Sequence, residues 1–542
     1  MATVTVAMLF VKLDPYRMAS GVYRSGNLLE AGRNDILFHR DGKTATVDVV
    51  RHRETNLVEI LTNGKSDAAI AVKPRLDPST DEPTMILMGA LAMALHPQGR
   101  TIACIGFGSG LTTHTLLANP ALARVDTVEI EREMVRGAQS FRPLNERAFS
   151  DPRSQVVIDD AKTYFSTRQE KYDVIVSEPS NPWVSGVAGL FSDEFYRIMR
   201  RHLADRGVFA QWLQLYEIDV PLVVSVLKAL EANFSDYVVY ASTGYDVLIF
   251  AANGGAMPSL DPRVLMNPQL AEPLARIGVR GIQDLEARLV GTRKSWEGLT
   301  RTIEVPMNSD YAPFLDQNAA RALFLRTRAG ILTLFQKTPF PAVELLSGLS
   351  RSRGITTISP APTFENARRS GEAMYLFEVL LERVDPRKVR FIASDDLHDD
   401  ACSVATWLEG CGTPPFPSLA RVLQRSLADL SVDEADAIFR SLHSSRCAFS
   451  LNPLERDWLD LLHAVGRRDP VGMIAGARRV LVEPRALSAP AVRYAVAAGM
   501  LGALAQGDVA GASEVWTRYG SSIAVADDLL LRTLVARTGI AQ

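Results

Sequence analysis

A glycine-rich turn between two apolar runs constrains the fold of this chain more than any other feature. The run Thr101–Ile105 opens into Gly106-Phe-Gly108-Ser109-Gly110, and the second apolar run ends at Glu129. A strand, a glycine turn and a helix-like segment in this order let the backbone approach a ligand closely. Glu129 then falls where a second parallel strand would end, with its carboxylate placed to accept hydrogen bonds from ribose hydroxyls. The stretch therefore predicts a nucleoside site in a parallel α/β sheet.

The spacing of the glycines separates two kinds of nucleoside ligand. A dinucleotide fingerprint, G-x-G-x-x-G, would need its third glycine at position 111, which is Leu111. The G-x-G-x-G pattern that is present, with an acid 19 positions after Gly110, is more typical of a turn that holds S-adenosylmethionine or a relative. The predicted cofactor contacts from this stretch are Gly106, Gly108, Ser109, Gly110, Glu129 and Ile130.

Composition excludes several classes of protein. The 542 residues are 47% hydrophobic and 22% charged, enough for two or three globular domains. The formal net charge is -3, and Lys and Arg are scattered, so we expect no nucleic-acid partner. Four cysteines in so long a chain form neither a disulfide scaffold nor a convincing metal spacing, so we expect no metal and a cytoplasmic location. The apolar Met1–Val11 is too short for a membrane span and lacks signal-peptide features, and we expect no transmembrane segment elsewhere.

Between Glu82 and about Ala252, apolar strands alternate with helical stretches. This alternation predicts a doubly wound, Rossmann-like sheet of the methyltransferase type. The two last strands are joined by a short link, so we expect them to pair antiparallel at one edge. The predicted strands are Thr101–Ile105, Val125–Ile130, Gln155–Ile158, Tyr172–Ser177, Val208–Trp212, Tyr237–Tyr240 and Val247–Ala251.

The segments on either side have other patterns. Residues from about 20 to 75 alternate in the strand manner around the turns Arg40–Lys43 and Asn63-Gly64, which predicts a small antiparallel sheet. Beyond about residue 330 strand signals nearly vanish and amphipathic helical stretches follow. We therefore expect an N-terminal β domain (1–80), a Rossmann-like domain (81–255), a connecting segment (256–330) and an all-α region (331–542).

Two stretches of the predicted all-α region resemble each other, Leu461–Ala477 and Leu501–Ala512. Their aspartates Asp469 and Asp508 lie 39 residues apart, and each is expected to cap a helix after a tight turn. Helical hairpins of the tetratricopeptide kind give this pattern, and a nonrepetitive helical bundle explains it equally well. A protein partner would bind at this region.

Ligands of open parallel sheets bind beyond the carboxyl ends of the strands. Asp159-Asp160-Ala161 follows the third predicted strand, and we assign Asp160 to the adenine amino group and Asp159 to the helix cap. The stretch Glu178–Phe191 follows the fourth strand, and its prolines and glycines are typical of a lid over a substrate. Trp183 in this lid either walls the acceptor site or packs the lid.

With these motifs the chain resembles the spermidine synthase (polyamine aminopropyltransferase) family, in particular a divergent bacterial branch related to transporter-fused members. The likeness covers about residues 20 to 252. It is carried by Leu61–Gly64, Ile105–Gly110, Val128–Ile130, Asp160-Ala161, Tyr172–Val176 and Gly207–Gln211.

The resemblance implies transfer of an aminopropyl group from decarboxylated S-adenosylmethionine to an amine or polyamine acceptor. In the family the loop after the fourth strand carries two aspartates spaced D-x-x-D, and here Glu178 and Asn181 hold those positions. The glycine loop of the family usually carries an aspartate that repels the carboxylate of S-adenosylmethionine, and here the residue is Ser109. The expected acceptor tyrosine is replaced by Thr84-Met85.

We therefore expect an aminopropyltransferase-like enzyme with Glu178 as acid–base or cation-holding group and Asn181 as positioning group. Asp81, Glu82, Trp183 and Gln211 are the further candidates for substrate binding. The co-substrate is decarboxylated S-adenosylmethionine or S-adenosylmethionine itself, and a homodimer is compatible with the resemblance. Two alternatives stay open: an S-adenosylmethionine-dependent methyltransferase, and a noncatalytic nucleoside-binding scaffold.

Overall fold

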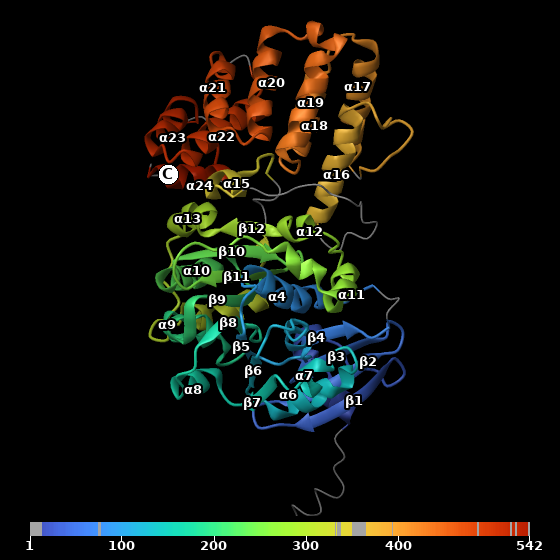
Figure 1. Ribbon diagram of the computed structural model, residues 1–542, viewed down its shortest axis with the longest axis vertical. Coiled ribbons are helices and arrows are strands. Elements are labelled where there is room, and N and C mark those ends of the chain that lie inside the picture. Colours follow the sequence, from blue (N-terminus) through green and yellow to red (C-terminus); the bar gives the residue numbers. More distant parts are fainter. Residues whose placement is uncertain are drawn as a thin grey trace, which may run out of the picture.

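The computed structural model describes residues 14–73, 77–330, 332, 338–349, 365–392, 394–484, 487–520, 523–525 and 528–539. The stretch Met1–Val11, expected to be neither signal peptide nor membrane span, lies outside these residues. Three parts follow one another along the chain (Figure 1): a small antiparallel sheet, a larger sheet flanked by helices, and a region of helices alone.

The small sheet precedes the nucleoside motif. Its four strands pair antiparallel in the order β1–β2–β3–β4, as the alternation predicts. Asn63 (φ 50°) and Gly64 (φ 75°) form the left-handed turn between the last two strands, which is the geometry that tight hairpins require. Two short helices precede this sheet. The elements are α2 (Pro15–Ala19), α3 (Val22–Ser25), β1 (Asn34–Asp41), β2 (Thr46–His52), β3 (Leu57–Thr62) and β4 (Lys65–Ala71).

The larger sheet has eight strands in the order β12–β10–β11–β9–β8–β5–β6–β7. The five strands from β9 to β7 are parallel, and β11, β10 and β12 add antiparallel pairs. The strands are β5 (Thr101–Ile105), β6 (Arg124–Glu129), β7 (Ser154–Ile158), β8 (Tyr172–Ser177), β9 (Leu203–Gln214), β10 (Asp236–Ala241), β11 (Asp246–Ala252) and β12 (Leu289–Thr292).

The antiparallel pairing of β10 with β11 confirms the expectation, but this pair does not form the edge of the sheet. The edge strand is β12, from the segment expected to be only a connection. Its four residues are too few to show an alternating pattern, so the sequence gives little sign of this strand.

Helices pack in two groups around the larger sheet. In one, α4 contacts β9, β11 and α5, and in the other, α9 contacts α8 and α10. Two helix layers around one parallel core are the arrangement of a doubly wound sheet. The helices are α4 (Glu82–Leu95), α5 (Leu111–Leu116), α6 (Arg132–Gly137), η1 (Ala138–Phe141), α7 (Arg147–Ser150), α8 (Ala161–Ser166), η2 (Val187–Phe191), α9 (Asp193–His202), α10 (Val220–Asn233), η3 (Pro262–Met266), α11 (Pro268–Arg276), α12 (Ile282–Glu286), α13 (Arg293–Thr302) and α14 (Phe314–Phe324).

The small sheet is held against the larger one through α6. A Cβ on Gly137 of this helix would lie 3.2 to 3.3 Å from side-chain atoms of Val49, Ile60 and Phe38, so the helix backbone packs directly on the small sheet. This contact brings the β3–β4 hairpin near the carboxyl ends of β5 and β6.

The helical region forms the far end of the molecule (Figure 1). Asp469 caps α21 and Asp508 caps α23, and both follow a left-handed residue, Arg468 (φ 54°) and Gly507 (φ 76°), so the predicted caps and turns are confirmed. The helices are α15 (Ala342–Ser347), α16 (Glu365–Leu380), α17 (Asp395–Gly410), α18 (Phe416–Leu427), α19 (Val432–Ser444), η5 (Arg446–Ser450), α20 (Pro453–Gly466), α21 (Pro470–Val480), α22 (Ala489–Ala505), α23 (Val509–Val515), η7 (Trp516–Gly520) and α24 (Leu529–Thr538).

The last helix returns to the sheet. A Cβ on Gly298 of α13 would lie 2.4 Å from the carbonyl oxygen of Thr533 in α24, so the two helices touch through their backbones. Arg537 of α24 also donates a hydrogen bond to the carbonyl of Lys294, at 3.0 Å. The helical region is therefore packed onto the sheet rather than attached only through its linker.

Two of the four cysteines are paired. Cys411 and Cys447 form a disulfide between the end of α17 and η5, with sulfur atoms 2.01 Å apart. The pairing was not visible in the sequence because 36 residues separate the two. Disulfides are typical of proteins in oxidising compartments, whereas the sequence analysis expects a cytoplasmic location.

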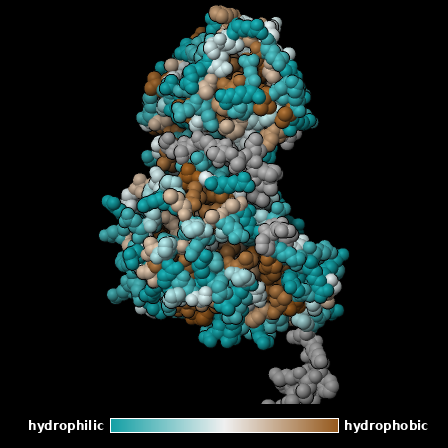
Figure 2. Space-filling model, turned by 45° about the vertical axis from the view of Figure 1, so that its right-hand side comes forward, coloured by the Kyte–Doolittle hydropathy of each residue, from teal (hydrophilic) through white to brown (hydrophobic). Residues whose placement is uncertain are grey.

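The surface shows no sign of a membrane span where the structure describes it. No helix among the described residues is long and apolar enough to cross a membrane. On the face shown in Figure 2, hydrophobic side chains form separate patches between hydrophilic ones.

Candidate active site

A cavity of about 1290 Å³ lies between the small sheet and the carboxyl ends of the parallel strands. It is larger than the roughly 300–1,000 Å³ of ordinary ligand pockets, so it has room for two substrates. Its wall comes from the β3–β4 hairpin, the turn after β5, the end of β6, the start of α8, the loop after β8 and the loop before β11. This is the edge of the sheet at which the sequence predicts ligand binding.

The glycine turn has the backbone that its sequence requires. Gly106 (φ 92°), Gly108 (φ 50°) and Gly110 (φ 79°) all lie in the left-handed region. A Cβ on Gly106 would lie 2.5 Å from the carbonyl oxygen of Glu178, so this glycine also permits the close approach of the loop after β8. Gly106 and Gly108 line the cavity, as predicted from the motif.

The other two members of the turn do not line the cavity. The buried Ser109 hydroxyl donates to the sulfur of Met85 at 3.0 Å, and Gly110 begins α5 against the ring of Phe107. The turn directs the Ser109 side chain into the protein, and the ligand contacts expected of Ser109 and Gly110 stay predictions. Asn145 fixes this part of the turn by donating to the carbonyl of Ser109 at 2.7 Å.

Glu129 ends β6 and lines the cavity beside Ile130. Its carboxylate accepts hydrogen bonds from the backbone N–H groups of Phe107 (2.9 Å) and Glu131 (2.8 Å). Burial raises the pKa of Glu129 to about 7, and these two hydrogen bonds oppose the shift. Glu131, which the sequence analysis did not select, also lines the cavity and accepts two hydrogen bonds from Thr44, both at 2.7 Å.

The start of α8 corrects the roles assigned to two aspartates. Asp160, not Asp159, is the N-cap, and it accepts from the N–H of Thr163 at 2.8 Å. Asp159 accepts from the N–H of Asp160 at 2.9 Å. The sequence cannot distinguish these roles, because either aspartate could stand one position before the helix. Both line the cavity together with Ala161.

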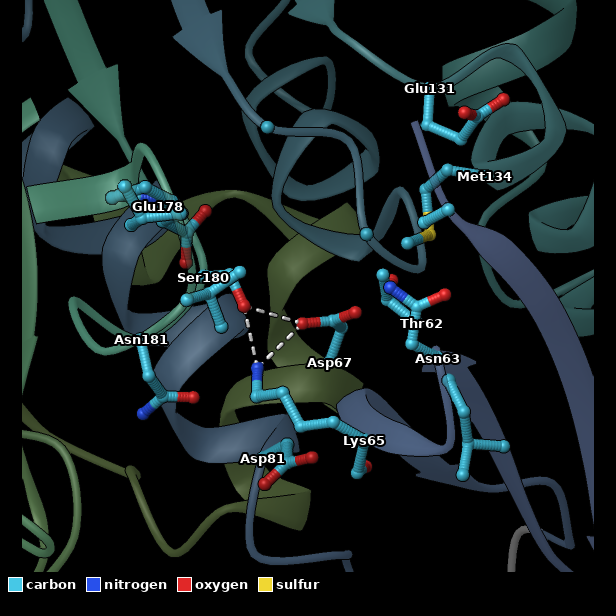
Figure 3. Close-up of a pocket in the computed structure, with 18 of the residues that line it drawn as sticks. Thr62, Asn63, Lys65, Asp67, Asp81, Glu131, Met134, Glu178, Ser180 and Asn181 are labelled. Carbon is cyan, nitrogen blue, oxygen red and sulfur yellow. Dashed lines mark hydrogen bonds and ion pairs between the residues drawn. The ribbon is translucent and has the colours of Figure 1, made fainter. Parts of the chain in front are cut away.

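Glu178 and Asn181 begin the loop after β8 and line the cavity (Figure 3). Burial raises the pKa of Glu178 to about 7, and a hydrogen bond with Thr112 opposes the shift. The buried Asn181 donates through Nδ2 to the hydroxyl of Tyr216 at 3.3 Å. Its Oδ1 is buried and has no hydrogen-bond partner among the described residues. A polar ligand can therefore donate to Asn181 Oδ1.

Two more carboxylates face the same cavity. Asp81 precedes α4 without capping it, and burial raises its pKa to about 6. Asp246, at the start of β11, accepts from Trp212 Nε1 and from the Thr243 hydroxyl, both at 3.1 Å. Burial raises the pKa of Asp246 to about 7, with a further contribution from the charge of Asp81. Asp246 was missed because it belongs to an antiparallel strand, where the rule of strand ends gives no signal.

The central part of this chain is similar to known proteins. The family model described as the spermine/spermidine synthase domain matches residues 85–245. The polyamine aminopropyltransferase of Pyrobaculum calidifontis is 32% identical over 203 residues, which are 35% of this chain and 67% of that protein. That of Nitrosomonas europaea is 28% identical over 246 residues, 44% of this chain and 74% of that protein. The chain belongs to the spermidine synthase (polyamine aminopropyltransferase) family.

Other aminopropyltransferases are matched over about half of their length. A crystal structure of spermidine synthase in complex with the transition-state analogue AdoDATO shares 18% identity, with a TM-score of 0.38 over 45% of this chain and 85% of that one. The match to the family model ends at residue 245, so the helical region lies outside it.

Three residues that the sequence analysis proposes for substrate binding lie outside the cavity wall. Glu82 is buried in an ion pair with Arg276, at 2.7 Å, and braces α4. Gln211 is buried in β9 and donates to the carbonyls of Ser177 and Trp212. The ring of Trp183 lies under the side chains of Arg24 and Lys65, which both line the cavity. None of these three residues lines the cavity, and their predicted contacts with substrate stay predictions.

Proposed function

We propose that this protein transfers an aminopropyl group from decarboxylated S-adenosylmethionine to an amine in polyamine biosynthesis. One observation carries the proposal. Three carboxylates, those of Asp81, Glu178 and Asp246, face one cavity. None of them forms an ion pair with Lys or Arg in the part of the chain that the structure describes.

Such an arrangement favours a cationic ligand. Burial disfavours the charged form of each carboxylate, and the charges of Asp81 and Asp246 repel each other. An ammonium group bound between them would relieve both effects, since it supplies the missing opposite charge. Amines are ammonium ions at neutral pH, so the cavity supports an acceptor with amine groups.

The two ends of such an acceptor would meet different groups. Glu178 lies beside the glycine turn, because its backbone contacts Gly106. Asp81 and Asp246 lie near Tyr216, on which both of their charges act. We assign the reacting amine to Glu178, with Asn181 Oδ1 accepting one of its N–H groups, and the remote ammonium to Asp81 and Asp246.

The chemical step follows from these positions. Glu178 takes a proton from the acceptor ammonium, and a pKa of about 7 suits this exchange at neutral pH. The freed nitrogen lone pair attacks the methylene carbon next to the sulfonium of the donor. The new C–N bond forms as the C–S bond breaks, and the electron pair of the broken bond stays on sulfur. The products are methylthioadenosine and the alkylated amine, which is formed as an ammonium ion, and Glu178 then returns its proton to solvent.

The nucleoside of the donor would lie at the other end of the cavity. Gly106 and Gly108 allow close approach of the backbone, and Glu129 can accept from the ribose hydroxyls with lone pairs that its two backbone partners leave free. Asp160 uses Oδ1 for the helix cap, so its second oxygen is the acceptor that we assign to the adenine amino group, beside Ile130 and Ala161.

A second candidate, methyl transfer from intact S-adenosylmethionine, is favoured by one observation. The glycine turn presents no acid to the cavity, because Ser109 faces Met85. The carboxylate of the intact donor would therefore meet no repulsion from the turn.

The first experiment separates these functions. The purified protein is incubated with each donor and a panel of diamines, and the nucleoside product is identified by mass spectrometry. We expect methylthioadenosine and an amine heavier by one aminopropyl group. S-adenosylhomocysteine would establish methyl transfer instead, and the absence of both products would overturn the proposed enzyme. Polyamine synthesis would place the protein in the cytoplasm.

A further inference from the structure

We propose that Lys65 is a resident ammonium group, which fills one cation site of the cavity and so limits how many ammonium groups an acceptor can bring into it. The inference rests on the proposed function, because it concerns the choice of acceptor.

The Lys65 ammonium sits in a set of partners that would suit a ligand (Figure 3). Its Nζ donates to Asp67 Oδ1 at 2.6 Å and to the Ser180 hydroxyl at 2.7 Å. The Ser180 hydroxyl donates to the same Asp67 oxygen at 2.9 Å, which closes a triangle. The ring of Trp183 lies under the ammonium, with 5.7 Å between Nζ and the ring centroid. A carboxylate, a hydroxyl and an aromatic face are the groups with which proteins bind ligand ammonium ions.

The ammonium of Lys65 lies in the wall of the cavity. Lys65, Asp67 and Ser180 all line it, yet only 5% of the Lys65 side chain and 12% of the Asp67 side chain are exposed. Ser180 is two residues after Glu178, and Figure 3 shows Lys65 between Ser180 and Asp81. The resident ammonium therefore lies among the carboxylates to which we assign the acceptor.

The ion pair of Lys65 determines which carboxylates of the acceptor site remain for a ligand. Asp67 is neutralised by Lys65, whereas Asp81, Glu178 and Asp246 have no ion-pair partner among the described residues. The cavity thus leaves room for one ammonium at Glu178 and another at Asp81 and Asp246. Asp67 could hold a further ammonium beside Ser180, but Lys65 occupies it. Lys65 is thereby a determinant of specificity for acceptors with two ammonium groups.

A merely structural role makes a different prediction. Lys65 also joins β4 to the loop after β8 through Ser180. If Lys65 served only to link these two segments, its removal would destabilise the loop and weaken the binding of all amines to the same extent. If Lys65 fills a cation site, its removal raises the affinity for a triamine and leaves the affinity for a diamine unchanged.

The test compares the wild type with Lys65→Met, which keeps a chain of similar length without the charge. Diaminobutane and spermidine are each titrated by calorimetry into protein saturated with methylthioadenosine, and both are assayed as acceptors. We expect the ratio of spermidine to diaminobutane affinity to rise at least about tenfold in Lys65→Met. In the double variant Lys65→Met/Asp67→Asn the rise should disappear, because the vacated site then lacks its carboxylate. Lys65→Arg keeps the cation and should leave the ratio unchanged.

An unchanged ratio in a Lys65→Met protein that melts like the wild type would overturn the inference, and so would equal losses for both amines. If Lys65→Met does not fold, Asp67→Asn serves instead: it leaves Lys65 without its carboxylate, and the inference then requires spermidine to bind no better. The calorimetric readout keeps the two proposals apart. Amine binding without aminopropyl transfer would refute the proposed function while the affinity ratio still decides the role of Lys65.

Discussion

The two ends of the cavity use their carboxylates in opposite ways. At the nucleoside end, Glu129 accepts from two backbone N–H groups and Asp160 from the start of a helix. At the acceptor end, the hydrogen bonds to Asp246 come from the side chains of Trp212 and Thr243, and Asp81 caps no helix. Backbone amides hold a carboxylate in place for a neutral partner such as a hydroxyl. At the acceptor end Glu178 and Asp246 are held instead by side-chain donors in the described part of the chain, so the two ends differ in the kind of donor that each acid meets.

The largest effect expected from this comparison concerns Glu178. Glu178→Gln removes the proton acceptor, so kcat should fall by about a hundredfold to ten-thousandfold. The nucleoside end is untouched, so methylthioadenosine should bind the variant as it binds the wild type. Rapid-quench kinetics and calorimetry measure the two quantities. The surface variant Glu146→Gln is the control, since this acid pairs only with Arg142 in an exposed ion pair. Unchanged turnover in Glu178→Gln would exclude Glu178 as the base.

Gly106 belongs to the glycine turn at the nucleoside end and contacts Glu178 at the acceptor end. Its substitution should therefore impair both ends of the cavity and remove the difference between them. Gly106→Ala places a side chain at φ 92° and 2.5 Å from the carbonyl of Glu178. We expect methylthioadenosine affinity to fall by about tenfold to a hundredfold, with a loss of amine affinity alongside. Gly412→Ala is the matched control, because a Cβ there meets no atom within 4 Å. Normal binding of both ligands to Gly106→Ala would contradict the close contact between the turn and the loop.

Substitution of Asp246 should affect the acceptor end alone, and so it tests the difference between the two ends more finely. Asp246→Asn keeps an acceptor for Trp212 and Thr243 but removes the charge, so amine affinity should fall about fivefold. Methylthioadenosine affinity should not change. Asp159→Asn, on the nucleoside side of the same cavity, should leave amine affinity as it is. Equal losses of amine affinity in both variants would mean that the acceptor is not bound by charge at Asp246.

The smallest effect is a dependence of stability on pH. Glu129, Glu178 and Asp246 have folded-state pKa values of about 7, above their ordinary values. Groups with raised pKa values cost stability as they ionise, so the melting temperature should fall between about pH 5 and about pH 8. Diaminobutane should reduce this fall, because an ammonium lowers the pKa values of Glu178 and Asp246. Glu129 lies at the nucleoside end, so its contribution to the fall should remain with diamine present. A pH profile with no response to diamine would place the amine elsewhere.

The helical region shows which kinds of feature the sequence can predict. The caps Asp469 and Asp508 and the turns before them are confirmed, because a cap and its helix are neighbours in the chain. The disulfide in the same region was missed, because pairing of Cys411 with Cys447 depends on how η5 packs against the end of α17. Features that depend on neighbouring residues can be predicted from short stretches of sequence, whereas contacts between distant stretches cannot.

The sequence by itself determined the glycine turn, the parallel core of the sheet and Glu129 at the end of β6. These depend on backbone conformation and on the alternation of strands and helices, which neighbouring residues specify. Only the tertiary structure decided which acids face the cavity. It turned Ser109 inward, paired Glu82 with Arg276 and brought Asp81 and Asp246 together. A strand end gives a side chain its place along the sheet, but the direction in which it points, and the partner that it finds, depend on elements packed from elsewhere in the chain.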